Sequence, residues 1–236
     1  MSSYGVSFSV KYARELSLDW QQCFLALITE LGVRRFRLMS YWDEIEAVRG
    51  TFDFSELDWQ LEQCQKHDVD VTLCLGLRQP RYPECHLPAW ATQLSGDELT
   101  EAVTTFNQKI VERYHTRKEI ITWQLENEAL NRGIGTCTDY SRRRLKIEFS
   151  HVKTLDTRPV VMSTSNSYGL PVLGPIPDVV GFSIYRSQYD YKHNKYTFSK
   201  TPAWFHRLRA GVSRWILRRP VIIHDTVRTL GAKSHG

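Results

Sequence analysis

The sequence contains no apolar run that approaches the roughly 20 residues of a membrane-spanning helix. Its first residues, Met1-Ser-Ser-Tyr, lead directly into a strand-like segment without the charged and apolar regions of a signal peptide. Repeats, low-complexity segments and linkers rich in Pro or Gly are also missing. These absences predict one domain over residues 1–236, without a membrane partner and cytoplasmic by default.

Cysteine is scarce and shows no ligand pattern. The five cysteines form no Cys-x-x-Cys pair and are odd in number: Cys23, Cys64, Cys74, Cys85 and Cys137. This pattern argues against both a zinc site and a disulfide framework. We therefore predict reduced thiols and no bound metal.

The net charge of +5 is spread along the chain apart from one basic concentration at Arg207, Arg209, Arg214, Arg218 and Arg219. The same segment carries apolar residues at helical spacing: Trp204, Leu208, Val212, Trp215 and Ile216. This combination predicts an amphipathic helix on the outside of the domain. A nucleic-acid or membrane face is the alternative that we do not adopt.

Short apolar, β-rich runs alternate with longer helical patterns along the chain, as in a parallel sheet with crossover helices. We predict seven strands, at residues 5–10, 35–39, 69–75, 120–125, 160–163, 179–184 and 220–224. Helices are predicted at residues 20–31, 55–66, 97–114, 140–155 and 204–217. A closed (β/α)8 barrel needs eight strands and about 250 residues. The prediction is thus an α/β TIM barrel that lacks its eighth βα unit.

The pair Asn127-Glu128 directly follows the predicted strand at residues 120–125. Glycosidic bond cleavage needs one protonated carboxyl to release the leaving oxygen and a second, ionised carboxyl facing the anomeric carbon. An Asn-Glu pair just past a buried strand resembles the proton-donor segment of many sugar-cleaving barrels. This resemblance implies that Glu128 supplies the proton and that Asn127 binds a sugar hydroxyl. A helix cap or a surface charge is the alternative reading of an isolated Asn-Glu pair.

The segment that begins in the second predicted strand carries a longer motif than the Asn127-Glu128 pair. It reads Arg37-Leu-Met-Ser-Tyr-Trp42-Asp-Glu-Ile-Glu46, then a Gly50 turn and Phe52-Asp-Phe54 before a helix. It resembles the second βα unit of clan A retaining glycosidases, especially the β-galactosidase-like and cellulase-like barrels. Ala47 stands where that family usually has Pro.

Other segments extend the resemblance over nearly the whole chain. Residues 76–90 resemble the loop after the third strand, where an aromatic such as Trp90 walls a sugar subsite; core packing is the alternative for Trp90. Trp123-Gln-Leu-Glu126-Asn127-Glu128 resembles the fourth strand, which ends in the family's acid/base and carries another acidic residue two positions earlier. Gly181-Phe-Ser-Ile-Tyr185 resembles the sixth strand, whose Tyr hydrogen-bonds the nucleophile.

The chain departs from the family at the seventh strand, where Asp225 stands in place of the nucleophilic Glu. Asp is one methylene shorter, and a retaining mechanism needs its two carboxyl groups about 5 to 5.5 Å apart. The following residues also lack the expected apolar loop and helix. We hypothesise that residues 225–236 are a frameshifted tail; a naturally divergent terminus is the alternative.

The resemblance implies a retaining β-glycosidase scaffold for an oligosaccharide or glycoside substrate, without a cofactor. Its site residues would be Glu128 as acid/base, Asp225 in the nucleophile's place, Arg37 and Tyr185 as positioners, and Asn127, Trp42 and Trp90 on the substrate. Turnover would be impaired in this copy. A silent carbohydrate-binding or partner-binding barrel is the second reading, and a metal-dependent isomerase or hydrolase using His224, Asp225 and Glu128 is the third.

The resemblance also carries two structural expectations. The side chains of Glu128, Tyr185, Arg37, Trp42 and Asp225 should converge at the C-terminal mouth of the strands, with Glu128 partly buried. An incomplete barrel should also expose apolar surface beside its first and seventh strands.

Overall fold

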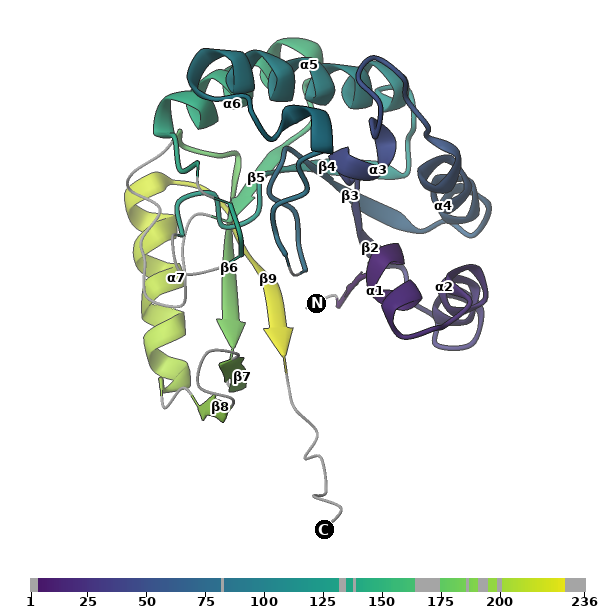
Figure 1. Cartoon of the computed structure of the whole chain (residues 1–236). Helices are drawn as coiled ribbons and strands as arrows, with labels where there is room; N and C mark the ends of the chain where they lie inside the picture. The colour runs from purple at the N-terminus through teal and green to yellow at the C-terminus, as the bar shows by residue number, and fades with distance from the viewer. Residues whose placement is uncertain are drawn as a thin grey trace.

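One parallel sheet curls into an open half-barrel (Figure 1). The computed structural model describes residues 4–81, 83–131, 135–137, 139–163, 175–185, 187–190, 195–198 and 201–227. The sheet runs in chain order through β1 (Val6–Ser7), β2 (Arg35–Met39), β3 (Asp70–Leu75), β4 (Ile120–Leu125), β5 (Val160–Ser163), β6 (Val179–Tyr185) and β9 (Val221–Val227). Neighbouring strands are parallel throughout, which confirms the incomplete TIM-barrel prediction.

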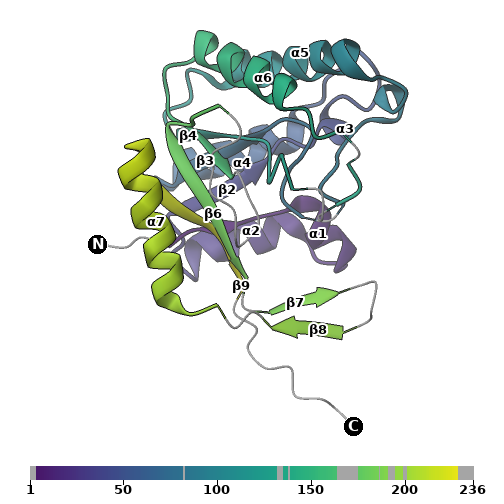
Figure 2. The same ribbon diagram turned by 90° about the vertical axis from the view of Figure 1, so that its left-hand side faces the viewer.

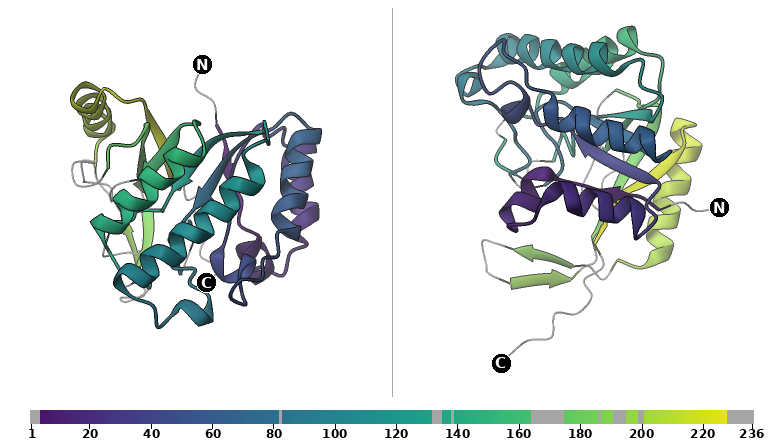
Figure 3. Two further views of the ribbon diagram at one scale, coloured as in Figure 1. Left: turned by 90° about the horizontal axis from the view of Figure 1, so that it is seen from above. Right: turned by 90° about the vertical axis from the view of Figure 1, so that its right-hand side faces the viewer.

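Five crossover helices follow the outside of the arc (Figures 1 and 3): α2 (Trp20–Thr29), α4 (Ser55–Lys66), α5 (Gly96–Tyr114), α6 (Arg142–Leu155) and α7 (Ala203–Leu217). Because helices cover one face and side chains of the barrel interior cover the other, the central strands β3 to β5 are mostly buried. All four residues of β5 are buried, for example. This burial explains why the strands read as continuous apolar runs in the sequence.

Several short elements were not predicted. The first predicted strand is shorter than residues 5–10 because Ser9 caps a helix: its hydroxyl accepts a hydrogen bond from the Tyr12 backbone N–H, and α1 (Val10–Glu15) begins there. The short α3 (Trp42–Ile45) and η1 (Ala89–Ala91) lie in loops. An antiparallel hairpin, β7 (Ser187–Asp190) and β8 (Lys195–Phe198), lies beyond the end of β6 (Figure 2).

The prediction of five reduced cysteines is wrong for two of them. Cys85 and Cys137 form a disulfide, with their Cα atoms 5.0 Å apart. The two cysteines are 52 residues apart in sequence, but they lie in the loops after β3 and β4, which are adjacent strands. Sheet order therefore brings together two residues whose sequence spacing carries no signal.

The flank beyond β9 presents apolar side chains to solvent. On α7, Trp215 is 82% exposed, whereas Arg209 is buried with its guanidinium over the Phe182 ring, 4.1 Å from the ring centroid. Ile223 of β9 is 59% exposed. The predicted helix exists, but its outward face is partly apolar because no further βα unit packs against it among the described residues. The expected exposure of this flank is thus observed.

Of the helices that the structure describes, none has the length and apolar character needed to cross a membrane. Residues 228–236, which make up most of the hypothetical frameshifted tail, lie outside the described part of the chain.

The exposed Trp215 ring gives a direct test of this flank. We expect Trp215→Glu to reduce self-association in sedimentation velocity and to change the free energy of unfolding by no more than about 0.5 kcal/mol, since the ring contacts little. Trp123→Glu, at a fully buried position of β4, is the control and should abolish the cooperative melt. A large loss of stability in Trp215→Glu would contradict the exposed placement of α7.

Candidate active site

Three polar residues, Glu126, Asn127 and Glu128, directly follow β4 at the C-terminal mouth of the sheet. Their exposures are 1%, 3% and 1%. Glu126 and Glu128 have φ angles of 51° and 46°, a left-handed backbone that costs a non-glycine residue on the order of 1 kcal/mol or more. Such conformations persist only where surrounding contacts enforce them, and they cluster at functional sites.

Glu128 is held by the neighbouring strand and by its own loop. Its backbone N–H donates to the Ser163 hydroxyl, at the end of β5, over 2.9 Å. Its Oε2 accepts a hydrogen bond from Asn131 Nδ2 at 2.8 Å. The backbone of Glu128 is therefore held at the end of β5, and its buried carboxyl group is held by its own loop.

Arg37 and Asn127 meet through a residue that the sequence analysis did not select. Arg37, on β2, is 7% exposed, and its Nη1 donates to Gln124 Oε1 at 3.4 Å. The Gln124 Nε2 group donates in turn to Asn127 Oδ1 at 3.2 Å. A fully buried Gln near the end of a mostly apolar strand was the signal for this role.

The two predicted tryptophans lie in the surrounding layer. Trp42 is fully buried, stacks on Phe106 of α5 and donates its indole N–H to Glu46 Oε2 at 2.7 Å. Trp90 is half-buried, packs edge-on against Trp42 and donates to the Glu46 carbonyl at 2.8 Å. Trp42 thus lies in the hydrophobic core, and Trp90 packs against that core. Contacts of either ring with a substrate remain predictions.

Tyr185 and Asp225 are placed by their backbones alone. Tyr185 ends β6, and Asp225 lies in the adjacent β9, paired in register with Ser183. The side chains of Tyr185, His224 and Asp225 lie outside the described part of the structure. Their convergence on Glu128, and their roles, remain predictions.

A buried ion cluster lies behind the β4 loop. The Arg144 guanidinium of α6 contacts Glu126 Oε1 at 2.8 Å, Glu148 Oε1 at 2.7 Å and Asp139 Oδ2 at 3.0 Å. Arg144 is 2% exposed and Glu148 is fully buried. Because one buried cation faces three carboxylates, the cluster is short of positive charge.

This imbalance shifts protonation. Burial, followed by the charge of nearby Glu126, raises the pKa of Glu148 to about 8. Burial alone would lower the pKa of Arg144, but the surrounding carboxylates outweigh it and raise that pKa. The cluster is therefore most stable with Glu148 protonated.

Glu126 joins the ends of β3 and β4. Its carboxylate accepts hydrogen bonds from the backbone N–H groups of Leu77 at 3.2 Å and Arg78 at 2.8 Å. A Cβ atom at Gly76 would lie 2.6 Å from this carboxylate, so only glycine permits the approach. Glu126 is thus a structural carboxylate, bound on every side by the scaffold.

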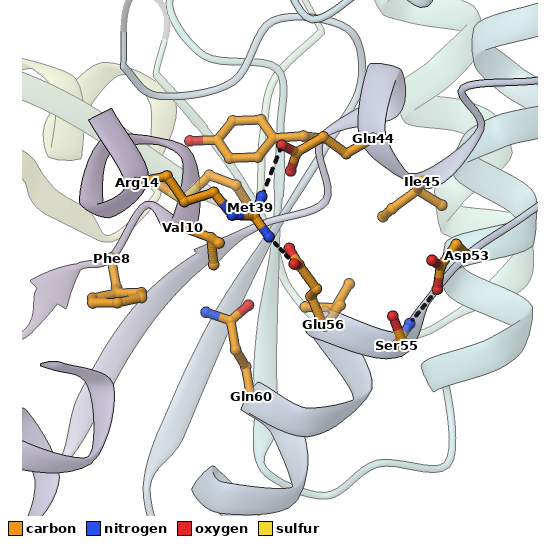
Figure 4. A pocket seen from close by; sticks show the side chains of 12 residues that line it. Phe8, Val10, Arg14, Met39, Glu44, Ile45, Asp53, Ser55, Glu56 and Gln60 are labelled. Carbon is orange, nitrogen blue, oxygen red and sulfur yellow. Dashed lines mark hydrogen bonds and ion pairs between the residues drawn. The ribbon is translucent and has the colours of Figure 1, made fainter. Parts of the chain in front are cut away.

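A separate cavity of about 240 Å³ lies between α1, α3 and α4 (Figure 4). Apolar walls such as Phe8 and Leu57 enclose it, and Arg14 spans its rim in ion pairs with Glu44 and Glu56. None of the predicted site residues lines this cavity, so it is distinct from the β4 site.

Comparison with known proteins gives distant glycosidase relatives. No family model matches the chain. A β-galactosidase, BgaA of Clostridium cellulovorans, is 25% identical over 154 residues, which cover 55% of this chain and 23% of that protein. A β-galactosidase of Halorubrum lacusprofundi is 23% identical over 137 residues, covering 48% of this chain and 18% of the relative. The matched segments are thus less than a quarter of these relatives' length.

Solved structures share the fold at low identity. The exo-β-1,4-mannosidase Op5Man5 of an Opitutaceae bacterium has a TM-score of 0.58 at 15% identity, over 78% of this chain and 37% of that one. A GH5_18 protein of Streptomyces cattleya in complex with GlcNAc has a TM-score of 0.60 at 13% identity, over 77% and 50%. The β-galactosidase of Bacillus circulans has a TM-score of 0.57 at 14% identity, over 90% and 42%. These neighbours confirm the barrel fold, and the two β-galactosidase matches agree with the glycosidase resemblance that the sequence motifs indicated.

Two adjacent arginines test the ion cluster. Arg144→Met should destabilise the protein by about 3–5 kcal/mol, because it leaves buried carboxylates without their cation. Arg143→Met removes an ion pair to Asp97 whose side chains are more than 70% exposed, so we expect a change of at most about 0.5 kcal/mol. Equal effects of the two substitutions in urea unfolding would contradict the assigned burial.

Glu148 should impose a pH dependence on stability. Its pKa is above the ordinary value of 4.5 in the folded state, so the folded protein binds more protons and stability falls as pH rises from about 4.5 to 8. Glu148→Gln resembles the protonated form and should lose less stability over that window, at up to about 1.4 kcal/mol per pH unit. Parallel pH dependences for the variant and the wild type in urea unfolding would show that Glu148 is already ionised.

Proposed function

We propose that this chain is a retaining β-glycosidase scaffold in which Glu128 is the acid/base. The observation that carries the proposal is the buried, left-handed Glu128 after β4, fixed by Ser163 and Asn131 beside Asn127. Enzymes on barrel folds assemble their sites at this C-terminal face. The substrate would be an oligosaccharide or glycoside, as suggested by neighbours such as a GH5_18 protein in complex with Manβ1-4GlcNAc.

Asp225 takes the nucleophile's position in this proposal. It lies in the β9 strand, beside β6 and its terminal Tyr185. The missing methylene would draw the carboxylate back from the anomeric carbon, and a misplacement of about 1 Å costs on the order of a hundredfold in rate. Asp225 thus favours slow turnover.

The shorter side chain of Asp225 also favours a second function, which is binding without cleavage. If Asp225 does not form the covalent intermediate, the barrel would bind carbohydrate or a partner without cleaving it. A sugar that binds and remains intact over long incubation would indicate this second function.

A four-way comparison tests catalysis on a panel of aryl β-glycosides. The proteins are the chain itself, Asp225→Glu, a longer version that continues through an eighth βα unit, and the longer version with Asp225→Glu. We expect little activity from either change alone, because the shorter carboxylate and the open barrel each limit turnover. Only the combination should hydrolyse the glycosides well, with retention of anomeric configuration by NMR.

Glu128→Gln in the combined protein should then lower kcat/KM by about 10²–10⁴-fold on substrates with poor leaving groups, which depend most on proton donation. Glu112→Gln, on the exposed face of α5, is the matched control and should leave activity unchanged. Hydrolysis by the original chain that survives Asp225→Asn would refute the assigned nucleophile.

A further inference from the structure

The loop after β3 folds back as a short hairpin against Asn127. Arg78 pairs with Cys85 in an antiparallel bridge, and the Gln79 N–H donates to the Glu84 carbonyl at 3.0 Å. The Asn127 N–H donates to the Arg78 carbonyl at 2.7 Å. The base of the hairpin is therefore attached to the backbone of the candidate site.

The far side of the hairpin is tied covalently to the loop after β4. The Cys85–Cys137 disulfide makes this link. Close packing supports it: Gly135 has a φ of +76°, and a Cβ atom there would lie 2.5 Å from Glu84 Cβ. Only glycine fits this contact, so the two loops meet at the residue beside the disulfide.

Glu84 uses this position to reach the Asn127 side chain. Its Oε2 accepts a hydrogen bond from Asn127 Nδ2 at 2.7 Å. At the other end of the carboxamide, Asn127 Oδ1 accepts from Gln124 Nε2 at 3.2 Å and from the Ser163 hydroxyl at 3.3 Å. If the Asn127 carboxamide were flipped, its NH₂ group would face the Gln124 NH₂ group, and its carbonyl oxygen would face the Glu84 carboxylate. These contacts therefore fix one orientation.

We infer that Glu84 is a positioning residue that sets the orientation of Asn127, and that the Cys85–Cys137 disulfide holds Glu84 in place. The inference rests on the proposed function, in which Asn127 contacts the sugar beside Glu128. Glu84 acts on the sugar through Asn127. Neither residue of the disulfide takes part in the chemistry.

The arrangement makes the site sensitive to reduction. A dithiol attacks one sulfur of the disulfide as a thiolate, which forms a mixed disulfide and releases the other cysteine as a thiolate that takes up a proton. The second thiol of the reagent then attacks the mixed disulfide and releases the remaining cysteine. Cys85 and Cys137 become thiols, and the dithiol becomes a cyclic disulfide. The hairpin keeps its backbone bridge at Arg78 but loses its tether, so Glu84 no longer constrains Asn127.

The side-chain NH₂ resonances of Asn127 report the positioning without any sugar. They are identified by their loss in Asn127→Asp. A hydrogen bond to a carboxylate should shift one proton downfield in the wild type, and Glu84→Ala should remove that shift. Glu84→Gln, which keeps an acceptor, should retain part of it, and Glu112→Ala is the control that should change nothing.

Reduction of the folded protein tests the role of the Cys85–Cys137 disulfide. Alkylation followed by intact mass should detect three reactive thiols before dithiothreitol and five after it, measured in denaturant. The Asn127 resonances should move on reduction in the wild type, and should already be displaced in the Cys85→Ser/Cys137→Ser protein. Cys23→Ser, at a free cysteine, should behave as wild type. Five thiols before reduction, or Asn127 resonances unmoved by reduction and by Glu84→Ala, would overturn the inference.

Sugar binding separates this inference from the proposed function. With an aryl β-glycoside that the wild type binds, Glu84→Ala should weaken binding by about tenfold, the effect expected if the unfixed Asn127 carboxamide loses one hydrogen bond to the sugar, and Glu84→Gln should restore part of it. Unchanged affinity in Glu84→Ala would overturn the positioning role. If the wild type binds no glycoside, the proposed function fails, and the Asn127 resonances still decide the inference.

Discussion

The fold of the candidate site depends on the buried ion pair between Arg144 and Glu126. Glu126 adopts a left-handed backbone immediately before Asn127, and its carboxylate accepts the backbone N–H groups at the end of β3. One carboxylate therefore joins two strand ends, and Arg144 brings α6 to the same point. A buried carboxylate is costly without its cation, so the ion pair with Arg144 holds Glu126 in place. Glu128 lies two residues further along the same loop, and its position therefore depends on this ion pair.

The β4 loop is thus fixed from two directions by different kinds of interaction. The ion cluster holds it from the helical layer, where burial raises the pKa of Glu148. The Cys85–Cys137 disulfide holds the outer hairpin, and through Glu84 the Asn127 side chain. Sequence spacing did not suggest this covalent link. Disulfides are typical of secreted proteins in oxidising surroundings and are rare in cytoplasmic proteins.

The open flank of the half-barrel contrasts with this well-fixed loop. Trp215 of α7 and Ile223 of β9 are exposed to solvent. Among the described residues, β1 and β9 are the edge strands of the sheet. The glycosidases that resemble the chain are at least twice as long as the part it matches. Glu126, Asn127 and Glu128 lie within the well-contacted part of the described residues, whereas Asp225 lies in β9, at the open edge of the sheet.

The sequence by itself determined the parallel βα order and the place of Glu128, because strand periodicity and the Asn127-Glu128 pair are local signals that need no knowledge of distant residues. It also determined that Asp225 departs from the family pattern. Only the tertiary structure decided which side chains contact one another. It places Trp42 in the core, links Arg37 to Asn127 through Gln124, and joins Cys85 to Cys137. Arg37 and Gln124 are far apart in the chain, as are Cys85 and Cys137. The curvature and register of the sheet, rather than any local pattern, bring these pairs within bonding distance.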